Sequence, residues 1–192
     1  MTRHRHFMIY KPYRYLSQFV NNGQKQGSKR LLGQLYDFPD RTMAIGRLDE
    51  KSEGLLLLTT DGKISNEICS GNVEKEYYAQ LDGIITQDAI KSLAQGIEIG
   101  FEGKKYITKP CAVKVLETLP NFPERERKIR DDRHGPTSWV SITLKEGKFR
   151  QVRKMTSAVG FPTLRLVRVR VGNIHLNKMQ IGEVIELNEI LY

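Results

Sequence analysis

The sequence predicts an α+β fold in which many short strands are combined with a few helices. Its 192 residues, of which 39% are hydrophobic, can bury one core, either in one domain or in one domain with two lobes. Apolar residues alternate in several short stretches, as in strands, whereas only a few stretches show the spacing of a helix. No internal repeat or low-complexity tract interrupts this pattern, so we expect residues 1–192 to form a single domain.

The first part of the chain predicts strands separated by two helices. Phe7 and Ile9 share one face of a strand that Lys11 and Pro12 end, because proline cannot donate to a strand ladder. The continuous apolar run at residues 55–58 is bounded by glycines, which fits a strand buried on both faces. The predicted elements are a strand at 5–10, a loop at 21–29, a short helix at 31–36, strands at 43–45 and 55–60, and a helix at 63–69 closed by Gly71.

The rest of the chain predicts a second group of strands with amphipathic helices. Residues 73–81 alternate so that Tyr77 lies on the more apolar face, where a tyrosine is commonly a core residue. Thr86 is a suitable N-cap for a helix that ends near Gly96. The remaining strands are a hairpin at 97–106 around Glu102 and Gly103, strands at 108–116, 139–144 and 163–171, and a last sheet segment at 174–187.

A fourth helix is expected from residue 148 to Gly160. Arg150 and Arg153 lie on a face adjacent to its apolar stripe, and a charged helix face is usually just solvated. The apolar stripe comprises Phe149, Val152, Met155 and Val159.

The charge of the chain indicates its class of partner. It has 31 Lys and Arg residues against 22 Asp and Glu, a formal charge of +9 and a pI near 9.6. A surplus of this size predicts a polyanionic partner, with nucleic acid as the leading candidate. The alternative is that the basic residues serve only solubility.

Neither a metal site nor a membrane segment is expected. Cys69 and Cys111 lie in unrelated segments without metal-ligand spacing and predict reduced, buried thiols. His4 and His6 alternate with arginines in a terminus that we expect to fray. No signal peptide is visible and no apolar run is long enough to cross a bilayer. We therefore expect a cytoplasmic protein that has no contact with a membrane.

A polar loop at residues 46–54 joins two of the predicted strands. It carries Arg47, Asp49, Ser52 and Glu53 between glycines. Catalytic groups are often found on short loops held by rigid strands. From spacing alone, however, such a loop is more often a simple turn, and both interpretations remain open.

This loop and three later segments resemble motifs of the RsuA-type pseudouridine synthases, which isomerise uridine in ribosomal RNA. Residues 46–62, GRLDEKSEGLLLLTTDG, resemble the first motif without interruption. The KEY sequence at 75–77 resembles the second motif, GKFRQVRKM at 147–155 the third, and LVRVRVG at 166–172 the closing motif. Arg14 replaces a glycine that often follows the Lys-Pro of this family, which concerns only the local turn.

The resemblance implies a role for each matching side chain. Asp49 would be the nucleophile, and Arg153 would pair with it. Tyr77 would pack against the target base, a stacking contact worth about 1–3 kcal/mol. Arg47 would fill the gap left by the extruded base or hold a phosphate, and Leu166 would line the active site. Further contacts with the RNA backbone are expected from Lys148, Arg150, Lys154, Arg165, Arg168 and Arg170.

Residues 125–128 and 136–139 resemble one branch of the family, the large-subunit pseudouridine synthase E group. That branch lacks the N-terminal S4 RNA-binding domain of its relatives, and we expect the same here. The resemblance implies one catalytic domain over residues 1–192, with a central mixed, mostly antiparallel sheet, flanking helices and two lobes around one cleft. It also implies 23S ribosomal RNA as partner and no cofactor, and we expect a monomer. The irregular, charged segment 121–136 is either a solvated loop or a contact to RNA.

Pseudouridine formation breaks the bond between ribose C1′ and uracil N1, turns the base and joins C1′ to C5. A carboxylate nucleophile can perform it without a metal or redox cofactor, provided that the uridine is flipped out of its stem. One alternative is a glycoside-cleaving hydrolase that uses Asp49 with Glu50 or Glu53 as a carboxylate pair. The other is a non-catalytic RNA-binding or ribosome-assembly module. Without the resemblance, the residues indicate only a basic, RNA-associated α+β domain.

Overall fold

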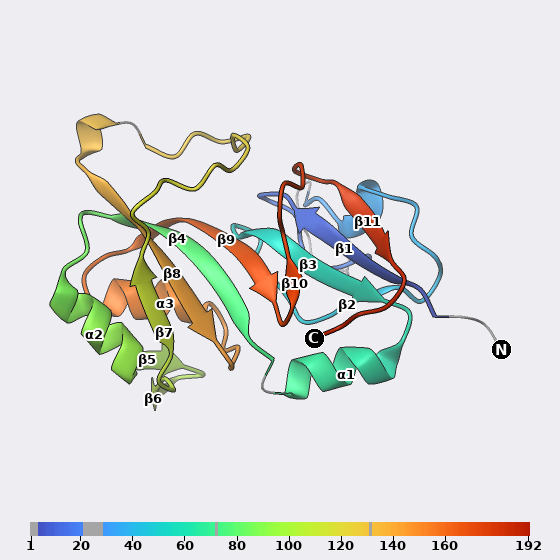
Figure 1. The fold of residues 1–192 in the computed structure, drawn as a ribbon, viewed down its shortest axis with the longest axis horizontal. Helices are drawn as coiled ribbons and strands as arrows, with labels where there is room; N and C mark the ends of the chain where they lie inside the picture. Colours follow the sequence, from blue (N-terminus) through green and yellow to red (C-terminus); the bar gives the residue numbers. More distant parts are fainter. Residues whose placement is uncertain (1–3, 21–28, 72, 131) are drawn as a thin grey trace. The chain divides into compact units, whose positions relative to one another are not determined.

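The computed structural model describes residues 4–20, 29–71, 73–130 and 132–192, which fold into two compact units (Figure 1). The chain is divided after Val73 and again after Val167, so both ends of the described chain belong to the first unit. Strand β9 (Thr163–Val171) crosses the second boundary. The loop expected at 21–29 lies, apart from Lys29, outside the described residues.

The first unit is an antiparallel sheet organised around β3. Its strands are β1 (His6–Lys11), β2 (Met43–Ala44), β3 (Glu53–Thr59), β10 (Ile174–His175) and β11 (Val184–Leu187). Strand β1 pairs with β3 on one side and with β11 on the other, β2 pairs with β3, and β10 pairs with the end of β9. All residues of β3 are buried, which confirms the strand predicted from its apolar run.

The helical elements of the first unit are short and capped by local side chains. Helix α1 (Gly62–Ser70) begins after Asp61, whose carboxylate accepts a hydrogen bond from the Lys63 N–H at 2.8 Å. It ends at Gly71, whose N–H donates to the carbonyl of Glu67. The helix expected at 31–36 is a single 3₁₀ turn, η1 (Leu32–Gln34).

The second unit packs two helices on antiparallel strands (Figure 1). Strand β8 pairs with β4 and with β7, while β5 and β6 form the expected hairpin with positive φ at Glu102 and Gly103. Its elements are β4 (Lys75–Asp82), α2 (Gln87–Gln95), β5 (Glu98–Phe101), β6 (Lys104–Ile107), β7 (Ala112–Val115), η2 (Asp132–His134), β8 (Thr137–Leu144) and α3 (Gln151–Ala158). The α+β class with mostly antiparallel pairing is confirmed.

Both helices of the second unit bury one face in the same core. Thr86 caps α2 as expected, accepting a hydrogen bond from the Ala89 N–H. Helix α2 contributes Leu93, and α3 contributes Met155, to a cluster with alternate residues of β4 and β8. That cluster includes Ala79, Leu81, Val140, Ile142, Leu144 and Leu166.

Three local expectations were wrong. Cys69, expected to be buried, is exposed near the end of α1. Phe149 does not join the core stripe of α3, because the backbone of Arg150 is left-handed, with φ of 54°, and the helix begins only at Gln151. The Phe149 side chain is 67% exposed. His6 does not fray: it is the buried first residue of β1, and its Nδ1 lies 2.9 Å from the hydroxyl of Thr59.

Candidate active site

The loop that carries Asp49 is clamped by one serine. The Ser17 hydroxyl donates to the carbonyl of Leu48 at 2.9 Å and accepts from its N–H at 3.0 Å, and the Leu48 side chain is buried. The Asp49 carbonyl in turn accepts a hydrogen bond from the Ser52 N–H, which closes the turn. Asp49 is thus half-buried on a loop of defined conformation, and Arg47 before it is exposed.

A buried lysine interacts electrostatically with two carboxylates of this loop. Lys11 is fully buried, and its ammonium donates to the carbonyls of Pro12 and Tyr15 at 2.9 and 2.7 Å. Burial lowers the pKa of Lys11 to about 7, although the negative charges of Glu53 and Asp49 act in the opposite direction. The sequence interpretation missed this residue. The alternation of side chains along the predicted first strand could have revealed it, because Lys11 lies on the same face as Phe7 and Ile9.

This lysine predicts a pH-dependent stability. Its pKa is about 7 in the folded chain and 10.5 in the unfolded chain, so between these values the unfolded state binds more protons. The free energy of unfolding should therefore rise with pH from about 7 to 10.5. We expect Lys11→Met to flatten this rise in urea unfolding, whereas Lys114→Met, at an exposed position of β7, should preserve it. A rise of equal size in Lys11→Met would contradict the assignment.

The second unit holds the other implied catalytic side chains. Tyr77 on β4 is half-buried and packs against the core cluster to which Leu166 belongs. Arg153 on α3 is half-buried, and its Nη1 donates to the carbonyl of Thr163 at 3.1 Å. The second unit therefore brings Tyr77 and Leu166 to one core and holds Arg153 against the start of β9. Asp49 and Arg47 belong to the first unit.

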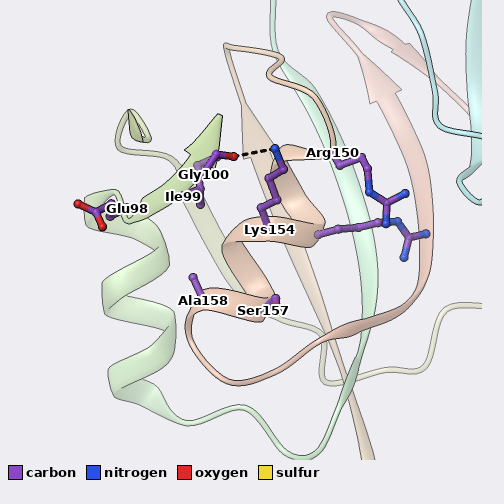
Figure 2. Close-up of a pocket in the computed structure, with 8 residues that line it drawn as sticks. Glu98, Ile99, Gly100, Arg150, Lys154, Ser157 and Ala158 are labelled. Atoms are coloured by element: carbon purple, nitrogen blue, oxygen red, sulfur yellow. Dashed lines mark hydrogen bonds between the residues drawn. The ribbon is translucent and has the colours of Figure 1, made fainter. Parts of the chain in front are cut away.

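A pocket of about 380 Å³ opens between α3 and β5 (Figure 2). Arg150, Arg153 and Lys154 line it, against the single acid Glu98. The Lys154 ammonium donates to the carbonyl of Gly100 at 2.7 Å, which holds the side chain across the pocket (Figure 2). A pocket with three cations and one acid favours a negatively charged ligand.

The turn before α3 is held by a hydrogen-bond network around Glu146. The Glu146 carboxylate accepts from the Tyr106 hydroxyl at 2.5 Å, the Lys109 N–H at 2.9 Å and the Gln151 amide at 2.6 Å. Burial alone would raise the pKa of Glu146, but the hydrogen bonds, led by that of Tyr106, outweigh it and the pKa is lowered. The Gln151 side chain also accepts from the Lys148 N–H at 2.9 Å. These hydrogen bonds therefore fix the conformation of the turn at 148–150.

The expectation that Arg165 and Arg168 are surface contacts for phosphate was wrong. They are only 7% and 4% exposed. Arg168 donates from Nε to the carbonyl of Leu55 at 2.7 Å, and Arg165 donates to the carbonyl of Pro123 at 2.9 Å and lies over the Phe122 ring. Both guanidinium groups therefore stabilise the folded chain through these backbone contacts.

The charged segment 121–136 is anchored to the rest of the second unit near both of its ends. The Phe122 ring contacts those of Tyr78 and Trp139, with centroids 6.1 and 5.8 Å apart. Arg130 forms a two-pronged ion pair with Asp82 at the end of β4. Contact of this segment with RNA stays a prediction.

Within the part of the chain that the structure describes, no three His, Cys, Asp or Glu side chains are grouped so that they could hold a metal ion. The same residues contain no helix that is both long and apolar enough for a membrane span.

Comparison with known proteins connects this geometry to a family. The RNA pseudouridylate synthase family matches residues 5–158, which include the Asp49 loop and all of α3. A protein of Xanthomonas axonopodis pv. citri, named ribosomal large subunit pseudouridine synthase E, is 36% identical over 174 residues, covering 90% of this chain and 88% of its own. A protein of the same name from Vibrio parahaemolyticus is 38% identical over 175 residues, covering 90% of this chain and 69% of its own.

The fold is similar to that of solved pseudouridylate synthases. One crystal structure of a pseudouridylate synthase superposes with a TM-score of 0.76 at 27% identity, covering 98% of this chain and 72% of that one.

Proposed function

The chain belongs to the RNA pseudouridylate synthase family, and we propose that it converts one uridine of large-subunit (23S) ribosomal RNA to pseudouridine, with Asp49 as nucleophile. The observation that carries the proposal is the Asp49 loop itself. Its sequence matches the family motif without interruption, and Ser17 holds it in one conformation beside buried β3. Such preorganisation is what a nucleophile on a loop requires.

The reaction is an isomerisation, and its atoms balance without a second substrate. The uridine is flipped out of its stem, the C1′–N1 bond breaks with Asp49 as nucleophile, and the base turns. The C1′–C5 bond then forms, C5 loses its proton and N1 gains one. Arg153 is proposed to keep Asp49 ionised, because a neighbouring cation favours the charged form of a carboxyl.

The remaining proposed roles concern binding of the RNA. Tyr77 is proposed to stack on the target base, and Leu166 to line the site. Arg47, Lys148, Arg150 and Lys154 are proposed to contact the RNA backbone, which fits the basic pocket beside α3. Because the family match crosses the boundary at Val73, both units are proposed to be parts of one catalytic domain.

The proposal is tested by mapping pseudouridine in 23S ribosomal RNA from cells with and without this chain. We expect one pseudouridine to disappear when the chain is absent and to return when it is supplied again. An unchanged set of modified positions would contradict a ribosomal substrate. The same measurement on other cellular RNAs would then identify the substrate class.

A further inference from the structure

The most exposed aromatic side chain of the second unit lies next to lysines. Phe149 is 67% exposed, and the left-handed backbone of Arg150 excludes it from α3. The Lys154 ammonium lies 5.4 Å from the centre of the Phe149 ring and 5.8 Å from that of Phe101. The Lys148 ammonium lies 5.1 Å from the Phe101 ring and 5.0 Å from that of Tyr106. We call these five side chains the aromatic–lysine cluster.

The exposed ring of Phe149 contributes nothing to the hydrophobic core of the second unit. Burial of such a ring stabilises a protein by about 1.5–3 kcal/mol, and here that gain is forgone. The exposure does not come from a loose loop, because the Gln151 side chain binds the Lys148 N–H and Glu146 binds the Gln151 amide. The Phe149 ring is therefore presented to solvent by a fixed turn.

The neighbouring charges determine which partner fits this ring. The Lys154 ammonium is held beside it by the carbonyl of Gly100, and three cations line the adjoining pocket. An exposed aromatic ring beside a fixed cation suits a ligand in which planar π-systems alternate with negative charges. Unpaired RNA has this pattern, because each base offers a face for stacking and each linkage carries a phosphate.

We propose that Phe149 is the stacking platform for an unpaired base of the substrate RNA, a nucleotide other than the target uridine, and that Lys148 and Lys154 bind the phosphates on either side of it. This inference rests on the proposed function and adds to it a subsite for single-stranded RNA. Stacking on Phe149 is tolerant of base identity, so the subsite contributes affinity and recognises unpaired structure. It predicts that this chain prefers RNA with an unstacked nucleotide to a continuous duplex.

The test compares substitutions at Phe149 in binding to a fluorescently labelled single-stranded RNA oligonucleotide. Phe149→Ala should weaken binding about 5- to 150-fold, which corresponds to about 1–3 kcal/mol for a stacked base. Phe149→Trp should bind about as tightly as the wild type. Phe149→Leu, which is apolar but cannot stack, should bind as weakly as Phe149→Ala. Leu119→Ala removes another exposed apolar side chain, 77% exposed, and should leave binding unchanged.

The salt dependence separates stacking from charge. Phe149→Ala should leave the slope of log affinity against log salt unchanged, because no phosphate contact is lost. Lys148→Gln and Lys154→Gln should each lower that slope by about 1. A 2-aminopurine base in the oligonucleotide should lose fluorescence on binding the wild-type chain but not Phe149→Ala.

Equal affinity of wild type, Phe149→Ala and Phe149→Leu for the oligonucleotide would overturn the inference. Loss of binding in Phe149→Ala together with a reduced salt slope would also overturn it, because the turn would then be merely structural. Pseudouridine formation by the wild type is measured in parallel. If it occurs while the Phe149 variants bind normally, the inference fails alone, and if the wild type forms no pseudouridine, the proposed function fails.

Discussion

Replacing Asp49 with asparagine is expected to reduce pseudouridine formation to background while the chain stays folded. The substitution keeps the shape of the side chain and removes its charge and its nucleophilic oxygen. Affinity for RNA should change little or rise slightly, because the proposed phosphate contacts lie elsewhere and one negative charge is lost. The measurement is pseudouridine formation in ribosomal RNA, with RNA binding and thermal unfolding measured on the same preparation.

Glu50→Gln is the matched control for Asp49→Asn. It makes the same chemical change at the next position, which is also half-buried. The proposed mechanism expects Glu50→Gln to retain activity, whereas a hydrolase with an Asp49–Glu50 carboxylate pair would lose it. Substantial isomerisation by folded Asp49→Asn would refute the nucleophile, whatever the family resemblance.

Arg153→Ala is expected to lose almost all activity and some stability as well. The truncation removes the proposed partner of Asp49 and also the donor to the carbonyl of Thr163. Leaving that half-buried carbonyl unsatisfied should lower the free energy of unfolding by about 1–3 kcal/mol. Asp49→Asn, by contrast, should lose mainly activity. Urea unfolding beside kcat and KM for both variants distinguishes these patterns.

Arg153→Lys separates the charge of the side chain from its shape. Lysine keeps the positive charge but lacks the planar fork of arginine, so we expect partial recovery of stability and only weak recovery of kcat. Wild-type kcat for Arg153→Ala, after correction for the folded fraction, would exclude Arg153 from the chemistry and leave it a structural role at Thr163.

Local sequence signals predicted much of the fold. The apolar run in β3, the N-cap Thr86 and the hairpin at Glu102 act over a few residues, and each is confirmed. The error at Phe149 has a local cause that apolar spacing cannot reveal. The spacing of apolar residues in α3 extends back to Phe149, but a left-handed backbone at Arg150 delays the start of the helix.

The environments of charged residues were harder to predict, because their partners are distant in sequence. Arg168 binds the carbonyl of Leu55, and Arg165 binds that of Pro123. A count of basic residues assigns both to the RNA surface, although burial makes them part of the fold. Lys11 differs, because the carbonyls that satisfy it come from the turn that directly follows β1, one and four residues along the chain. The Asp49 loop was found by its motif, but its clamp by Ser17 required the structure.

The division of the chain has a consequence for its synthesis. Residues 74–167 are contiguous, so the second unit can fold as soon as it leaves the ribosome. The first unit must wait, because β1 pairs with β11 and His6 lies opposite Leu187. Until then one edge of β1 lacks this partner, and closing so long a loop makes this pairing a slow step. The sheet of the first unit, which includes β3 behind the Asp49 loop, is therefore completed only when β11 has been translated.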